Sequence, residues 1–306
     1  MRAIIFPGQG AQHVGMGKSF FSGSKAAQAV FERADAALGI ALSKICFEGP
    51  ESELKKTDLC QPAILTCSAA IVAGCEERGL LKRDDFACAA GLSLGEYTAL
   101  WFAGALEFED AVRLVRARGQ GMQRASELAP SGMLALLGAT EEQAKNAAAK
   151  HAGSDVLVPA NFLCPGNIAI SGSKAALERV AANARADGIR RAIPLEVAGA
   201  FHSPLMEPGL ATLDAALAET RISAPRIPVL SNVTAERHGD AAAIRAGLRL
   251  QVTSPVLWEK SMRGLLALGV TDFFEPGPGA VLRGLLGKID ATASVRNVQT
   301  IEELNS

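Results

Sequence analysis

The chain has 306 residues, with 31 Lys and Arg side chains against 32 Asp and Glu side chains and a formal net charge of −1. Without a surplus of cations to neutralise phosphates, it is not expected to bind nucleic acid. It contains no run of about 18 uninterrupted apolar residues, so the sequence predicts a soluble protein without a membrane span. Its length fits one large domain or two unequal ones.

Cysteines and histidines narrow the possible chemistry. The six cysteines lie in apolar segments without a Cys-x-x-Cys pair. Buried, reduced thiols are typical of a cytoplasmic protein, so we expect that location. Catalysis by histidine has four side chains to draw on, namely His13, His151, His202 and His238.

Short apolar runs alternate with longer helical patterns along most of the chain. This order is typical of an α/β protein with a buried, largely parallel sheet. The patterns predict strands at 3–6, 86–90, 228–232 and 272–275, helices at 24–38, 62–78, 94–102, 107–128, 241–250 and 258–268, and a helix starting at 204.

The pattern changes between residues 129 and 197. It predicts the order βαββαβ over about 70 residues, which is that of a ferredoxin-like unit. We therefore expect a small ferredoxin-like subdomain at 129–197, inserted into a large discontinuous domain formed by 1–128 and 198–306. Its predicted strands are 133–137, 157–161, 167–171 and 191–197, and its predicted helices are 140–151 and 174–186.

The segment Gly91-Leu92-Ser93-Leu94-Gly95 lies between a predicted strand and a predicted helix. That context is typical of a nucleophile elbow, in which a strained turn exposes the serine hydroxyl. The helix that follows points free N–H groups and the positive end of its dipole toward a developing oxyanion. The segment predicts Ser93 as a nucleophile, although a glycine-rich turn with an incidental serine fits the same residues.

A nucleophilic serine needs a base, and His202 is the best placed histidine. It follows the predicted strand 191–197 and precedes a predicted helix start. Open α/β sheets place their sites in such loops, at the carboxyl edge of the strands. His13, in the first glycine-rich loop, is the competing candidate. His151 and His238 lie in polar surroundings, and we expect both to be solvated.

Arg118 lies on the predicted helix 107–128, close to its apolar stripe. A guanidinium in that position needs an anion. The anion is either a core-facing acid in a structural ion pair or the carboxylate of a substrate. The sequence pattern leaves both alternatives open.

The loop 7–13 contains a Gly-x-Gly segment that could be mistaken for a dinucleotide-binding motif. The third glycine of that motif would fall at His13, so the motif is incomplete. The loop is either a set of backbone donors facing an oxyanion or a structural turn.

Nine ordered motifs extend over nearly the whole chain: FPGQGAQ at 6–12, TxxxQPA at 57–63, GLSLGEYTAL at 91–100, RGxxMQ at 118–123, NxxxPGN at 161–167, GAFHSPLM at 199–206, SNVT at 231–234, QxxxPVxW at 251–258 and EPGPGxVL at 275–282. Together they resemble the malonyl-CoA:acyl carrier protein transacylase family. The resemblance implies an α/β-hydrolase-like core with a parallel sheet and an inserted ferredoxin-like subdomain.

The resemblance also implies roles for individual residues. Ser93 would accept the malonyl group, and His202 would act as base and acid. The side chain of Arg118 would bind the free malonyl carboxylate through two parallel hydrogen bonds. The backbone N–H groups of Gln9 and Leu94 would hold the oxyanion.

Further positions follow the family, and two depart from it. The backbone carbonyl of Gln251 would orient the imidazole in place of the Asp of a triad, and Phe201 resembles the malonyl-selective form, whose ring excludes a 2-methyl branch. Leu92 stands where the family usually has His, and Asn167 where it usually has Gln. We expect Leu92 to change the packing or tuning of the elbow without abolishing activity.

The implied reaction is a ping-pong transfer from malonyl-CoA, through Ser93, to the phosphopantetheine thiol of holo acyl carrier protein. The coenzyme A thioester is a substrate, so neither a cofactor nor a metal is implied, and we expect a monomer. Whether the carrier protein serves fatty acid or polyketide synthesis stays open.

Two other classes of protein compete with this interpretation. A serine thioesterase or esterase on a related core would carry its histidine near the C-terminus and would have no use for a buried cation such as Arg118. A silent module that only docks carrier protein is disfavoured because Ser93 and His202 are both retained.

Overall fold

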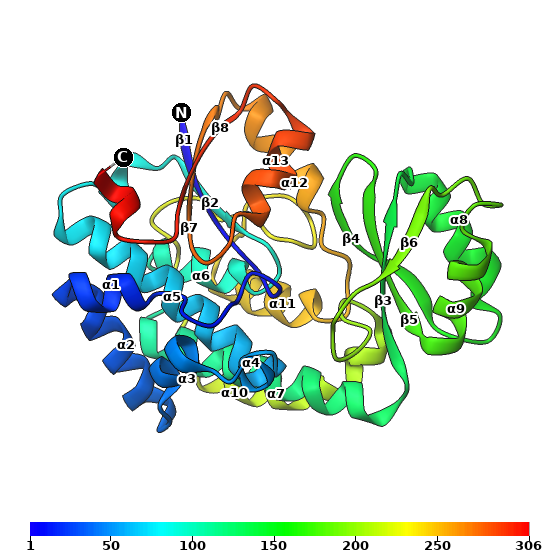
Figure 1. Ribbon diagram of the computed structural model, residues 1–306, viewed down its shortest axis with the longest axis horizontal. Helices are drawn as coiled ribbons and strands as arrows, with labels where there is room; N and C mark the ends of the chain where they lie inside the picture. Colours follow the sequence, from blue (N-terminus) through cyan, green and yellow to red (C-terminus); the bar gives the residue numbers. More distant parts are fainter. Residues whose placement is uncertain (306) are drawn as a thin grey trace.

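The computed structural model describes residues 1–305, which form two separate sheets and the helices around them (Figure 1). The first sheet is parallel, with the strand order β2-β1-β7-β8. Short, wholly apolar segments such as CAAG in β2 are typical of parallel strands buried on both faces. The strands are β1 (Arg2–Phe6), β2 (Cys88–Gly91), β7 (Asp272–Pro276) and β8 (Ser294–Val298).

Alternate side chains of β1 enter two different hydrophobic cores, because successive residues of a strand point to opposite faces. Ile4 and Phe6 belong to the larger core, whereas Ala3 and Ile5 belong to a second one. The sheet is therefore covered on both sides. The helices of the larger core include α2 (Lys25–Leu38), α5 (Thr57–Glu77) and α7 (Phe108–Leu128), and those of the second core are α12 (Trp258–Ala267) and α13 (Val281–Ile289).

Helix α5 is the central helix of the larger core. By length and composition alone it could cross a membrane, but 89% of its most apolar window is buried inside the protein. It packs against α2 and α7. The helix begins at Thr57, although the apolar pattern predicts a start at Pro62, because the proline is accommodated in the second turn at the cost of one backbone hydrogen bond.

The parallel sheet and the helices packed around it form the large lobe of the protein. Its remaining helices are α1 (Lys18–Gly23), α3 (Leu42–Glu48), α4 (Glu51–Leu54), α6 (Gly95–Phe102), α10 (Leu210–Glu219) and α11 (Ala241–Gln251), with 3-10 turns η1 (Arg83–Asp85), η2 (Pro204–Gly209) and η3 (Glu302–Asn305).

The second sheet is antiparallel, has the strand order β4-β5-β3-β6 and lies to the right in Figure 1. Two helices complete this lobe, and it has a hydrophobic core of its own. The backbone N–H of Phe162 donates to the carbonyl of Val256 (2.9 Å), which ties it to the large lobe. Its elements are β3 (Ser131–Leu137), α8 (Glu141–Ala152), β4 (Leu157–Cys164), β5 (Asn167–Ser173), α9 (Lys174–Asn183) and β6 (Arg191–Pro194).

The structure differs from the sequence prediction at several elements. The strand expected at 228–232 is reduced to single bridges, in which Val229 pairs with Ala89 and Leu230 with Arg237. The helix expected from Pro204 begins as a 3-10 turn before α10. Two elements near the C-terminus, α13 and β8, were not predicted, because α13 contains two glycines and β8 is a partly exposed edge strand.

Candidate active site

Ser93 occupies a sharp turn between the end of β2 and the start of α6. Its φ is 52°, a left-handed value that costs energy for a residue with a side chain. The turn closes because glycines flank it. A Cβ on Gly91 would lie 1.9 Å from the carbonyl carbon of Gly95, and a Cβ on Gly95 would lie 2.2 Å from the carbonyl oxygen of Phe6. Both glycines are therefore required by backbone contacts.

Gly95→Ala is expected to destabilise the protein by about 3 kcal/mol, because the new methyl group meets backbone that cannot rotate away. The free energy of unfolding from denaturant titration measures this. Gly264→Ala is the matched control, since Gly264 lies on α12 with nothing within 4 Å of the added Cβ. The control should leave stability unchanged or raise it by about 0.5–1 kcal/mol. Equal losses in both variants would contradict the argument.

His202 lies against the hydroxyl of Ser93. Its Nε2 is 2.8 Å from Ser93 Oγ, and its Nδ1 is 2.8 Å from the backbone oxygen of Gln251. A carbonyl only accepts, so Nδ1 carries the proton, and Nε2 is left to accept the hydrogen of the serine hydroxyl. Burial, and then the charge of Arg118, lower the pKa of His202 to about 4. The imidazole is therefore a neutral base at neutral pH.

Arg118 is buried beside the same hydroxyl, at 2% exposure. Its Nη2 donates to Ser93 Oγ (3.0 Å) and to Gln251 Oε1 (2.9 Å), while Nη1 donates to Gln61 Oε1 (2.8 Å). Its Nε is buried without a partner. Within residues 1–305 it has no carboxylate partner, which removes the structural ion pair as an explanation. A cation held by neutral groups is able to take an external anion.

The resemblance assigns the oxyanion to the backbone N–H groups of Gln9 and Leu94. Gln9 follows β1 and lines the cavity, and Leu94 is the N-cap of α6. The loop lies directly against the elbow, because a Cβ on Gly8 would be only 2.4 Å from the oxygen of Leu92. In the described part of the chain neither N–H donates a hydrogen bond. Both are available to an oxyanion.

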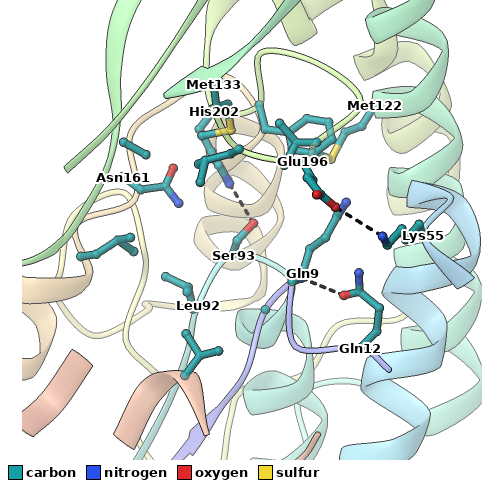
Figure 2. A pocket seen from close by; sticks show the side chains of 18 of the residues that line it. Gln9, Gln12, Lys55, Leu92, Ser93, Met122, Met133, Asn161, Glu196 and His202 are labelled. Atoms are coloured by element: carbon teal, nitrogen blue, oxygen red, sulfur yellow. Dashed lines mark hydrogen bonds and ion pairs between the residues drawn. The ribbon is translucent and has the colours of Figure 1, made fainter. Parts of the chain in front are cut away.

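A cavity of about 540 Å³ between the two lobes is lined by Gln9, Ser93, Arg118 and His202. Figure 2 shows the side chains of Ser93 and His202 pointing toward each other, with Leu92 below them and an ion pair between Lys55 and Glu196 (3.3 Å) at the side. Strands of the antiparallel sheet and the loops that follow β1 and β2 contribute to the wall. Other lining residues are Gly8, Gly10, Gln12, Glu51, Met122, Met133, Asn161, Leu163, Asn167, Ala169, Leu195, Val197, Phe201, Val281 and Leu285.

The structure adds residues that the sequence prediction did not assign to the site. The side chain of Asn232 accepts from the backbone N–H of Ser93 (2.6 Å) and donates to the carbonyl of Gly91 (2.8 Å), so it holds the elbow from outside. Gln61 and Glu96 also belong to the surrounding network. All three lie within the motifs SNVT, TxxxQPA and GLSLGEYTAL. Membership of these motifs is the sequence signal that could have identified them.

The histidines outside the site correct one expectation. The side chains of His238 and His151 are buried, not solvated. His238 Nε2 lies 2.6 Å from Glu96 Oε1, and His151 Nε2 lies 2.6 Å from Asp187 Oδ2. Each buried imidazole contacts a carboxylate, so it does not need water as a hydrogen-bond partner. His13 is exposed and does not line the cavity.

A serine that contacts both a neutral imidazole and a buried arginine without a carboxylate partner is an arrangement that suits the transfer of acidic acyl groups. The chain belongs to the acyl transferase domain family, whose pattern it matches over residues 3–285. It is 43% identical to the malonyl CoA-acyl carrier protein transacylase of Bacillus subtilis, over 98% of this chain and 95% of that protein. The corresponding protein of Salmonella typhimurium is 42% identical, over 96% of this chain and 95% of the relative. The resemblance drawn from the nine motifs is thereby confirmed.

Solved structures of similar proteins support the same family assignment. The malonyl CoA-acyl carrier protein transacylase of Clostridium perfringens superposes with a TM-score of 0.93 at 38% identity, covering 99% of this chain and 95% of that one. A malonyl-transacylase solved in complex with its type II PKS acyl-carrier protein has a TM-score of 0.94 at 36% identity, covering 99% and 97%. The mixed α/β fold with one parallel and one antiparallel sheet is shared with them.

Proposed function

We propose that this protein transfers a malonyl group from malonyl-CoA to the phosphopantetheine thiol of holo acyl carrier protein, with Ser93 as the intermediate acceptor. The observation that carries the proposal is the position of Arg118, buried without a carboxylate partner and 3.0 Å from the nucleophile. Such a cation offsets the cost of taking the free carboxylate of malonyl out of water. The names of the relatives and the carrier-protein complex support the same reaction.

The first half of the reaction acylates the serine. His202 Nε2 accepts the proton of Ser93 as Oγ attacks the thioester carbonyl, and the backbone N–H groups of Gln9 and Leu94 stabilise the oxyanion. The carbonyl of Gln251 keeps Nδ1 protonated throughout. When the C–S bond breaks, His202 returns its proton to the leaving thiolate, so coenzyme A departs as a thiol and malonyl-Ser93 remains.

The second half reverses these steps with a different thiol. The imidazole accepts the proton of the phosphopantetheine thiol, whose sulfur attacks the ester carbonyl of malonyl-Ser93. The C–O bond breaks, and His202 returns the proton to Ser93 Oγ. One thioester is consumed and another is formed, so the reaction needs no metal and no cofactor. Water must be kept from the ester, and the cavity between the lobes serves this purpose.

Phe201 and Arg118 set the choice of acyl group in this proposal. Arg118 binds the free carboxylate, with its unpartnered Nε available as a donor. Phe201 is buried beside His202 and lines the cavity. A bulky ring there leaves no room for a 2-methyl branch, as the family resemblance implies.

The finer description of the architecture is part of the same proposal. The order βαββαβ and the strand order β4-β5-β3-β6 support a ferredoxin-like subdomain at 129–197. Residues 1–128 and 198–306 then form the α/β-hydrolase-like catalytic domain. We expect a cytoplasmic monomer without affinity for membranes or nucleic acid.

Incubation with malonyl-CoA is expected to give a malonyl ester on Ser93, visible by intact-mass measurement. Ser93→Ala should give no adduct under the same conditions. A folded protein that forms no adduct would refute the transferase. An adduct that disappears in water as fast as it forms, without carrier protein, would favour the alternative function of a serine thioesterase or esterase. A panel of acyl-CoAs in the same experiment defines the accepted groups.

A further inference from the structure

Glu96 is a buried carboxylate behind the nucleophile, with 0% exposure. It belongs to the first turn of α6 and accepts three hydrogen bonds. Its donors are the backbone N–H of Asn232 (3.0 Å), Nε2 of Gln251 (2.7 Å) and Nε2 of His238 (2.6 Å). Within residues 1–305 no Lys or Arg pairs with it directly. A buried carboxylate whose partners are one imidazole and two neutral N–H groups is costly, so its position needs an explanation.

Gln251 connects this carboxylate to the site. Its Nε2 donates to Glu96 Oε2 (2.7 Å) and to the backbone oxygen of Ser93 (2.9 Å), while its Oε1 accepts from Arg118 (2.9 Å). If the amide flipped, its NH₂ would face the guanidinium and its oxygen would face the carboxylate, and both contacts would be repulsive. The orientation of the amide is therefore determined from both sides.

We propose that Glu96, held by His238, is a positioning residue for malonyl selectivity: it fixes the Gln251 amide so that its oxygen steadies Arg118 while the carboxylate itself stays one amide away from the guanidinium. The proposal rests on the proposed malonyl transfer. A carboxylate in direct contact with Arg118 would occupy the donors that the substrate needs. Placed behind an amide, Glu96 supplies negative charge to the buried cation and leaves the free edge of Arg118 to the substrate.

His238 completes this unit. Its backbone N–H donates to the carbonyl of Val229 (2.8 Å), which brings the residue inward from its polar segment. Its ring packs on α11, because a Cβ on Gly247 would lie 3.2 Å from His238 Cε1. Helix α11 ends at Gln251. The imidazole thus holds Glu96 through Nε2 and contacts the helix that carries Gln251.

The test compares two acyl donors, because acetyl-CoA has no free carboxylate for Arg118. In Glu96→Gln the kcat/KM for malonyl transfer to Ser93 is expected to fall about 10–100-fold, the usual effect of losing a hydrogen bond to a charged group. Most of the loss should appear in KM, since binding of the carboxylate is weakened before chemistry begins. Acetyl transfer should change much less. Time-resolved intact-mass measurement of acyl-Ser93 gives both rates.

A second pair of variants keeps the test valid if Glu96→Gln does not fold. His238→Ala removes the donor to Glu96 and should lower the malonyl-to-acetyl ratio, whereas His238→Gln supplies an amide N–H and should restore much of it. Glu76→Gln is the control, since Glu76 pairs with Arg83 (2.8 Å) and does not line the cavity. It should leave the ratio unchanged.

Two outcomes would overturn the positioning role: an unchanged malonyl-to-acetyl ratio in Glu96→Gln, whether both rates fall equally or neither falls, or no difference between the two His238 variants. Failure of the proposed function is distinguishable, because the wild-type protein would then form no malonyl adduct at all.

Discussion

His202→Ala is expected to slow the acylation of Ser93 by malonyl-CoA about 10²–10⁴-fold, the usual contribution of a positioned general base. The imidazole accepts the hydroxyl hydrogen across 2.8 Å. Within residues 1–305, Ser93 Oγ has hydrogen-bond partners in His202 and Arg118, and a guanidinium cannot act as a base at neutral pH. Rapid mixing followed by intact-mass analysis measures the rate. His13→Ala is the matched control, and it should keep the wild-type rate.

The pH profile separates a base from a merely structural histidine. Because the pKa of His202 is lowered to about 4, its imidazole is neutral at pH 6–8, and the wild-type rate should be flat there and fall below about pH 5. The residual rate of His202→Ala should lack that fall. A wild-type profile that rises through pH 6.5, the ordinary pKa of histidine, would contradict the assignment.

The free energy of unfolding, like the rate, is expected to decrease as the pH falls. Between about pH 4 and pH 6.5, His202 is protonated in the unfolded chain but neutral in the native protein. The stability from this group is complete above 6.5 and is lost as the pH falls toward 4. Circular dichroism at each pH must therefore show a folded protein before a fall in rate is assigned to the base.

The sequence predicted the elements that hold Ser93, His202 and Arg118 because each lies on a strong local signal. A glycine pattern between a strand and a helix defines the elbow, and the 3.6-residue period of α7 places Arg118 near the apolar stripe. Burial of that arginine, at 2% exposure, follows from the same period. The sequence left the partner of Arg118 open. In the structure its guanidinium donates to two glutamines, Gln61 and Gln251, in place of an acid.

The network behind the nucleophile could not be predicted in the same way. A glutamate in the first turn of a helix is usually a solvated group that favours the dipole, and nothing local to Glu96 indicates burial. The segment around His238 is polar, which is typical of an exposed loop. The burial of the His238 side chain depends on the bridge between Leu230 and Arg237 and on its packing against α11. The contact between His238 and Glu96 itself joins residues 142 positions apart in the chain.

Arg118→Ala is expected to reduce the kcat/KM for malonyl transfer about 10²–10³-fold, because it removes the partner of a carboxylate that is buried in the complex. Acetyl transfer should change far less, since acetyl needs no cation. Arg118→Lys retains the charge but loses the planar fork, so its malonyl rate should lie between those of the wild type and the alanine variant. Acylation of Ser93 is followed by intact mass with each donor.

Arg113→Ala is the control for this substitution, because Arg113 lies on the same helix and its side chain is 55% exposed. It should transfer both acyl groups at the wild-type rate. Removing Arg118 also leaves the side-chain oxygens of Gln61 and Gln251 without their donor, so some loss common to both substrates is expected. The ratio of malonyl to acetyl transfer cancels that common loss. If the ratio is unchanged, Arg118 has a structural role only, and the selectivity for malonyl must come from elsewhere in the cavity.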